Sequence, residues 1–181
     1  MSTIKKEVEK EATSLKTETT KRIWKDPDNH VFGEDEKLLT WIKNHPKEDK
    51  FGNPVELAIG TDSHIHGHYF KFPSVVCLYE KGKGGMYYFT TSYEHRKHFK
   101  GQQQIRMFQE VQKSVELASW IEEQTGWKPE IHIDASPAGS GHFTAPYSDS
   151  LKGYATGYGF KALVKPMSWC ANAISDRHSK C

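Results

Sequence analysis

Two apolar segments joined by a glycine-rich turn constrain the fold of this chain more than any other feature. Ser74–Glu80 and Met86–Tyr93 have the length and composition of β-strands, and the lysine- and glycine-rich residues 81–85 between them favour a hairpin turn. Glu56–Phe70, just before them, has apolar residues at alternate positions and predicts another strand. Together the three segments predict an antiparallel meander.

The hydrophobic pattern becomes helical after this meander. Gln102–Gln124 places its apolar residues on one stripe and predicts a long helix. Strand and helix patterns then alternate over Glu130–Ala135, Ser148–Thr156, Phe160–Lys165 and a final helix from Ser168 towards Lys180. The order is β-β-β-α-β-α-β-α. It predicts an α/β fold with a mixed five-stranded sheet and flanking helices, in which right-handed crossovers place the first strand beside the fourth.

The N-terminal residues differ in composition from the rest of the chain. Residues 1–25 are rich in Lys, Glu and Thr and carry only a sparse apolar stripe, so we interpret them as a charged arm, an N-terminal helical extension of marginal stability. Glu34–Asn44 predicts a second helix, which Pro46 ends. We therefore expect two regions, the arm over residues 1–25 and one folded domain over residues 31–181.

Length and composition exclude several classes of protein. The chain has 181 residues, which suit a single domain, and its 12% of aromatic residues argue against wholesale disorder. Neither a membrane span nor a secretory signal is expected, because apolar runs are short and the first residues are charged. Three widely spaced cysteines match neither a disulfide framework nor a zinc pattern, so we expect a cytoplasmic protein. The net charge of +2 does not by itself indicate a nucleic-acid partner.

Acidic residues occur where two predicted strands end. Asp62 follows Ile-Gly-Thr, and Asp134 follows Ile-His-Ile. If the first and fourth strands are parallel neighbours, the two side chains lie side by side at one edge of the sheet. A single Asp at a strand end is more often a turn former, but two on neighbouring strands favour a functional site.

Two further acidic residues are candidates for the same site. At about 100° per residue, Glu110 borders the apolar stripe of its helix and can reach the edge of the sheet, whereas Glu116 faces solvent. Asp176 lies in the predicted final helix, next to two cationic residues and His178, an imidazole that titrates near neutrality. Asp176 is alternatively a surface residue of that helix.

Several carboxylates at one place favour a site for Mg²⁺ or Mn²⁺. Carboxylates without a cation repel one another, and oxygen atoms are the ligands that Mg²⁺ prefers. Two such ions, about 3.5–4 Å apart, support the in-line attack of water on a phosphodiester. We expect His178 to assist this reaction through proton transfer or product release.

Other polar residues are candidates for contact with the substrate. Two of them follow the first carboxylate and five form a basic rim for phosphates: Ser63, His64, Lys81, Lys83, Arg96, Lys97 and Lys100. Tyr93 and Phe99 are interleaved with this rim and could stack on bases. Charged residues at hairpin tips are also common as a simple solubilising surface.

Alternating histidines suggest a different metal. His64, His66 and His68 share one face of the predicted first strand with Asp62, and imidazole suits zinc, copper or nickel. The same pattern is found in a solvated histidine face. Both interpretations stay open at this point.

The order of these motifs resembles the ribonuclease H-like superfamily and, within it, the YkuK-like group of poorly characterised bacterial proteins. The resemblance covers Val31–Lys180 and rests on Ile-Gly-Thr-Asp-Ser-His at 59–64, Arg-Met-Phe-Gln-Glu at 106–110, Ile-His-Ile-Asp at 131–134 and Ala-Ile-Ser-Asp-Arg-His-Ser-Lys at 173–180. It implies a ribonuclease H-like fold whose catalytic, metal-binding carboxylates are Asp62, Glu110, Asp134 and Asp176. The short final helix departs from the pattern of the superfamily.

These observations predict a nuclease that hydrolyses phosphodiester bonds of RNA, DNA or a hybrid with Mg²⁺ or Mn²⁺. The main alternative is a non-catalytic module that binds nucleic acid or protein on the same fold. A zinc hydrolase built on the histidine strand is a third interpretation. No membrane partner is expected, and the sequence does not indicate an oligomeric state.

Overall fold

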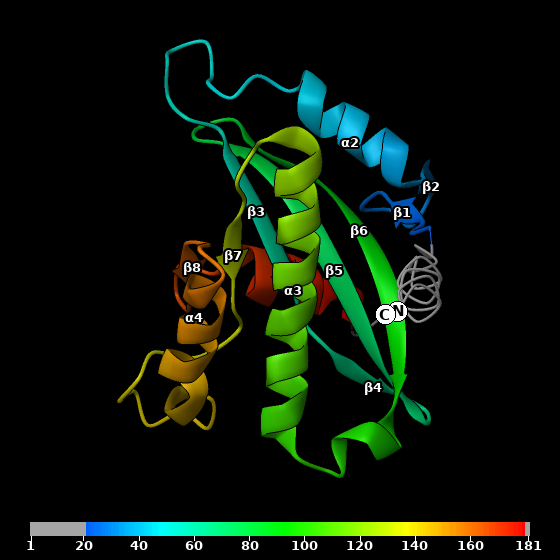
Figure 1. The fold of residues 1–181 in the computed structure, drawn as a ribbon, viewed down its shortest axis with the longest axis vertical. Coiled ribbons are helices and arrows are strands. Elements are labelled where there is room, and N and C mark those ends of the chain that lie inside the picture. Colours follow the sequence, from blue (N-terminus) through cyan, green and yellow to red (C-terminus); the bar gives the residue numbers. More distant parts are fainter. Residues whose placement is uncertain (1–20, 180–181) are drawn as a thin grey trace, which may run out of the picture.

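The computed structural model describes residues 21–179, and its centre is one mixed β-sheet of eight strands (Figure 1). Five strands correspond to the predicted ones: β3 (Glu56–Thr61), β5 (Tyr69–Glu80), β6 (Gly84–His95), β7 (Glu130–His132) and β8 (Ala162–Leu163). The other three are short: β1 (Trp24–Lys25), β2 (Val31–Gly33) and β4 (His64–His66). The strand order is β2-β1-β6-β5-β3-β7-β8, and β4 pairs with β5 outside this path.

The pairing of the strands follows their order in the sequence. β3, β5 and β6 form the antiparallel meander, and the β5–β6 ladder runs from the pair Tyr69–His95 to the pair Glu80–Gly84. β7 pairs in parallel with β3, and β8 pairs in parallel with β7. The predicted α/β fold with a mixed sheet is therefore confirmed, as is the predicted neighbourhood of its first and fourth strands.

The predicted first strand is interrupted in the structure. β3 ends at Thr61 and β4 begins at His64, so Asp62 and Ser63 lie between two strands. The chain then turns at Gly67, whose φ of 58° lies in the left-handed region that glycine tolerates. Because of this turn, β5 begins several residues earlier than predicted.

The prediction of an N-terminal arm over residues 1–25 is wrong for the last two of these residues. Trp24 and Lys25 form β1, which pairs with β2 and with Phe89 of β6, and the Trp24 side chain is fully buried. The indole Nε1 of Trp24 donates a hydrogen bond to Asp35 at 2.8 Å, which ties β1 to α2 (Asp35–Asn44). Residues 1–20, on which the rest of that prediction falls, lie outside the described residues.

Helical segments cover both faces of the sheet. Figure 1 shows α3 (Gln103–Thr125) crossing one face beside α4 (Ser148–Gly157), with the C-terminal segment behind the sheet. That segment is a π-helical turn, Cys170–Ser175, followed by α5 (Asp176–Ser179). No helix among residues 21–179 is long and apolar enough to cross a membrane.

The alternating direction of the side chains along β3 explains why helical segments pack on both faces of the sheet. Leu57 and Ile59 belong to the larger apolar core, which includes the buried stripe of α3. Ala58 points to the other face, where it packs with Cys170 of the C-terminal segment. Successive side chains of a strand point to opposite faces, so β3 holds α3 on one side and the C-terminal segment on the other.

Gly60 permits the closest of these contacts. A Cβ atom at this position would lie 2.6 Å from the backbone nitrogen of Ala171 and 2.8 Å from its Cα. The carbonyl of Gly60 also accepts a hydrogen bond from the Ser175 hydroxyl at 2.9 Å. The C-terminal segment can therefore lie directly on β3 only because residue 60 has no side chain.

The substitution Gly60→Ala should destabilise the protein by about 2 kcal/mol, because the added methyl group forces the backbone of the C-terminal segment away from β3. Equilibrium unfolding in urea measures this loss. Gly153→Ala is the matched control, because Gly153 lies inside α4 with no atom within 4 Å of an added Cβ. The control should keep or raise stability by up to about 1 kcal/mol. Equal stability of Gly60→Ala and the parent would contradict the close packing described here.

Candidate active site

Asp62 and Asp134 lie at corresponding positions after two adjacent parallel strands. The register of β3 and β7 pairs Gly60 with His132, and each aspartate follows two residues later. The predicted placement of both carboxylates at one edge of the sheet agrees with this register.

Glu110 approaches the same edge from α3. Its side chain is buried, with 7% of the residue exposed, and the Ser63 hydroxyl donates a hydrogen bond to its Oε1 at 2.5 Å. One turn further along α3, the Ser114 hydroxyl donates to Thr61 at 2.9 Å. Thr61 and Ser63 therefore hold the end of β3 against α3, and they position Glu110 there.

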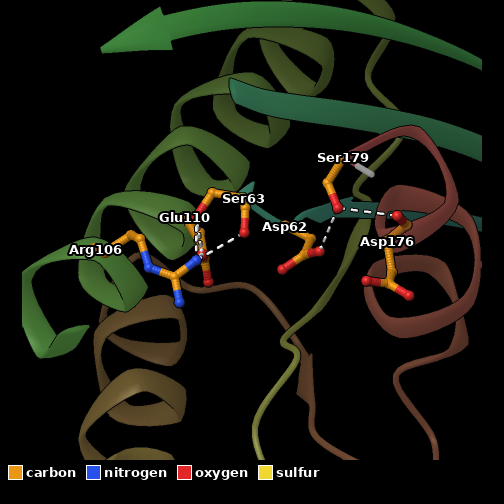
Figure 2. Close-up of polar contacts among 6 residues, drawn as sticks. All are labelled: Asp62, Ser63, Arg106, Glu110, Asp176 and Ser179. Carbon is orange, nitrogen blue, oxygen red and sulfur yellow. Dashed lines mark hydrogen bonds and ion pairs between the residues drawn. The ribbon is translucent and has the colours of Figure 1, made fainter. Parts of the chain in front are cut away.

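Arg106 completes the polar surroundings of Glu110. Its Nη1 donates hydrogen bonds to both the carbonyl and the hydroxyl of Ser63 at 2.7 Å and lies 3.4 Å from Oε1 of Glu110 (Figure 2). The sequence analysis assigned no role to Arg106. The signal was available, since Arg and Glu four residues apart lie on one helix face.

Asp62 is held from the opposite side by the C-terminal segment. The Ser179 hydroxyl donates to Oδ2 of Asp62 at 3.0 Å and also to the backbone carbonyl of Asp176 at 2.9 Å. Figure 2 shows Asp62 between the Glu110 group and the turn that carries Asp176. Ser179 was missed by the sequence analysis, although it belongs to the same short motif as Asp176.

Burial and mutual repulsion raise the pKa of two of these carboxyls. Burial is the largest cause for Asp62, whose pKa rises to about 6, and the charges of Asp134 and Asp176 raise it further. Burial also raises the pKa of Glu110 to about 8, with contributions from Asp62 and Asp134 that the Arg106 charge and the Ser63 hydrogen bond oppose. Four acidic side chains therefore influence one another at this edge of the sheet.

Asp134 has a cationic partner of its own. Nζ of Lys165 lies 2.5 Å from Oδ1 of Asp134, and the backbone N–H of Lys165 donates to the carbonyl of Ala135. Lys165 follows β8, the parallel neighbour of β7. Lys165 was not among the site residues predicted from the sequence, although it is the last residue of the predicted strand Phe160–Lys165.

The donor atoms at this edge suit a divalent cation. Glu110 and Asp134 line one narrow crevice, and the acidic residues here offer only oxygen donors, the kind that Mg²⁺ and Mn²⁺ prefer. A cation would relieve the repulsion that raises the pKa of Asp62 and Glu110. No group of three or more His, Cys, Asp or Glu side chains in residues 21–179 is placed to hold a metal ion as it stands. Metal binding would therefore require these side chains to reorient.

The structure places His178 against β6 rather than towards the carboxylates. Its ring stacks on Phe89 with 3.8 Å between centroids, and its Nε2 lies 3.0 Å from the Tyr87 hydroxyl. Burial, helped by the nearby charges of Arg177 and Lys71, lowers the pKa of His178 to about 4. The expectation that His178 transfers protons at the site finds no support in this packing, and we leave it out of the proposed mechanism.

The hairpin separates the predicted basic rim into two groups. Lys81 and Lys83 lie at the turn between β5 and β6, whereas Arg96, Lys97 and Lys100 lie beyond the other end of β6. Twelve-residue strands at about 3.4 Å per residue separate these groups by roughly 35 Å. The prediction of one continuous rim is wrong, because only the second group lies at the end of the sheet where α3 begins.

The alternating histidines form no metal centre among the described residues. His64 and His66 lie on β4 and are exposed, and His66 lies 6.0 Å from Tyr93 between ring centroids. His68 instead stacks with His95 at 6.5 Å. His66 and His68 therefore have separate partners, and the zinc interpretation gains no support from this arrangement.

Comparison with known proteins identifies one family. A family model described as Ribonuclease H-like matches residues 37–180, which include all four candidate carboxylates. The match is to the broad family and does not assign a subgroup. No curated protein and no solved structure matches the chain.

The raised pKa of Glu110 gives a testable dependence of stability on pH. In buffer without divalent cations, the free energy of unfolding should fall as pH rises from about 4.5 towards 8, because the folded chain keeps a proton that the unfolded chain releases. Glu110→Gln removes this group, so its urea unfolding curves should show a flatter dependence over that range.

Glu116→Gln is the matched control, since Glu116 lies exposed on the same helix. It should keep the pH dependence of the parent. An unchanged slope in Glu110→Gln would show that Glu110 titrates normally, contrary to its burial.

Proposed function

The chain belongs to the ribonuclease H-like family, and on this basis we propose that it is a divalent-metal-dependent nuclease that hydrolyses phosphodiester bonds of RNA or DNA. The observation that supports the proposal is the parallel pairing of β3 with β7, after which Asp62 and Asp134 each follow two residues beyond the pair Gly60–His132. Glu110, on α3, and Asp176, on α5, are the other two carboxylates of the proposed site. Fold alone would not support a function, since one fold hosts many activities.

The four carboxylates are the proposed ligands. Asp62, Glu110, Asp134 and Asp176 would hold Mg²⁺ or Mn²⁺, which supply positive charge and Lewis acidity at a phosphodiester. The other residues of the site position these carboxylates. Ser179 orients the Asp62 carboxylate, and the two residues around Glu110, Ser63 and Arg106, orient that of Glu110.

Burial favours the protonated form of the Glu110 carboxyl. Oε1 of Glu110 accepts hydrogen bonds from Ser63 and Arg106, so a proton on this carboxyl resides on Oε2. Burial raises the pKa of Glu110 to about 8, so a bound cation would compete with that proton for the carboxyl.

The ion pairs at the site favour a second candidate function. Arg106 already neutralises part of the Glu110 charge, and Lys165 pairs with Asp134. A module that binds nucleic acid without cleaving it would keep its carboxylates paired in this way. The assay below separates this binding module from the nuclease.

Purified protein with labelled RNA, DNA and RNA–DNA hybrid tests the proposal. Cleavage products should form with Mg²⁺ or Mn²⁺ and not with a chelator. Asp62→Asn and Asp134→Asn should lower the cleavage rate by more than about 100-fold, since removing a carboxylate removes a ligand rather than a supporting residue. Gel electrophoresis of the products measures the rate.

Glu116→Gln serves as the control, because it removes one carboxylate from the exposed face of α3 and leaves the site intact. Its cleavage rate should equal that of the parent. Cleavage at the parental rate by both Asp variants would refute the carboxylate mechanism. Tight binding of the same substrates by the parent without any cleavage would favour the binding module.

A further inference from the structure

A cavity of about 380 Å³ opens beside the candidate active site. It lies between β4, the start of β5 and the start of α3, and six of its lining residues carry the argument: Phe70, Arg96, Phe99, Gln102, Gln103 and Arg106. Its volume is in the range of pockets that hold small molecules, about 300–1,000 Å³. The mechanism proposed above does not use it.

The cavity combines an aromatic wall with two guanidinium groups. The rings of Phe70 and Phe99 meet edge to face with centroids 5.0 Å apart. The guanidinium carbons of Arg106 and Arg96 lie 5.4 Å and 5.9 Å from the centroid of Phe70. Guanidinium groups that lie over an aromatic ring form, together with that ring, a surface that accepts the flat face of a nucleobase.

The charge of the lining complements a phosphate. Arg96 and Arg106 contribute positive charge, and no Asp or Glu is among the residues that line the cavity. Gln102 and Gln103 add amide groups at the same wall, which can donate to and accept from the edge of a base. An anion with an attached aromatic ring therefore fits the cavity better than a purely apolar ligand.

Arg106 connects the cavity to the carboxylates. The guanidinium group that lines the cavity also donates to Ser63 and pairs with Glu110. A ligand in the cavity therefore lies one side chain away from the site where the phosphodiester is proposed to bind.

We propose that this cavity takes one unpaired nucleotide of the strand that is bound at the carboxylates. The inference rests on the proposed function, because it takes the bound strand as the source of the nucleotide. A base can stack on Phe70 only after it leaves its own stack and its base pair, so the cavity selects single-stranded or frayed substrates over blunt duplexes. The phosphate group and the flat face of the base are common to RNA and DNA.

Binding without cleavage tests this inference separately from the nuclease activity. Fluorescence anisotropy in chelator should measure the affinity of the parent for single-stranded RNA, single-stranded DNA and the corresponding blunt duplexes. The single strands should bind about tenfold more tightly than the duplexes, since stacking of one base accounts for a difference of that order. The two single strands show whether RNA or DNA is the source, and a preference for either supports the inference. A strand with one 2-aminopurine should also lose fluorescence as that base stacks in the cavity.

Two variants locate the binding in the cavity. Phe70→Leu keeps an apolar side chain but removes the ring, and it should bind single strands about tenfold more weakly. Gln102→Glu introduces a negative charge into the lining at an exposed position and should also weaken binding. Gln104→Glu is the matched control, because Gln104 is exposed two residues further along and does not line the cavity.

The outcomes distinguish the two proposals. Equal affinity for single strands and duplexes, or equal binding by Gln102→Glu and Gln104→Glu, would overturn the assignment of the cavity. If the parent binds single strands as described but never cleaves them, the cavity stands and the nuclease proposal fails. If the cavity variants cleave blunt duplexes and single strands as the parent does, the nuclease stands and the cavity assignment fails.

Discussion

Backbone hydrogen bonds between β3 and β7 set Gly60 opposite His132, and the positions of Asp62 and Asp134 follow from this register. Parallel neighbours need a crossover between them, and α3 belongs to that connection, so the same pairing brings Glu110 to the edge of the sheet. On the other face, the missing side chain of Gly60 lets the C-terminal segment lie on β3 and present Ser179 to Asp62. One pairing of strands therefore brings together carboxylates from four distant parts of the chain.

The same arrangement places negative charges where burial disfavours them. Burial is the largest cause of the raised pKa of both Asp62 and Glu110, and their neighbours add repulsion. Four contacts offset part of this cost. Glu110 accepts a hydrogen bond from Ser63 and forms an ion pair with Arg106. Asp62 accepts a hydrogen bond from Ser179, and Asp134 forms an ion pair with Lys165. A structural core gains nothing from such repulsion, whereas a site that receives a cation does.

The sequence predicted the features that follow from hydrophobic periodicity and from the order of the strands and helices along the chain. Alternation in β3 and the apolar stripe of α3 are local patterns, and together they placed Asp62, Glu110 and Asp134 near one edge. Features that depend on tertiary packing were missed or wrong. Trp24 joins the sheet as β1 because its side chain finds a buried position next to α2, which no local pattern indicates. The position of His178 close to Asp176 in the sequence suggested a role in proton transfer. In the folded chain the C-terminal segment packs on the sheet so that the His178 ring lies against Phe89 of β6.

These carboxylates are proposed to form one cation site, and the anomalous scattering of bound Mn²⁺ would locate a cation held there. Crystals of the parent and of Asp134→Asn, both grown with Mn²⁺, should be compared in anomalous difference maps. We expect a strong peak within ligand distance of Asp62 and Asp134 in the parent, with Glu110 turned towards it, and a weaker peak or none in the variant. A fully ordered parent crystal with no Mn²⁺ between Asp62 and Asp134, or with Mn²⁺ bound only at β4, would contradict a cation site formed by these carboxylates.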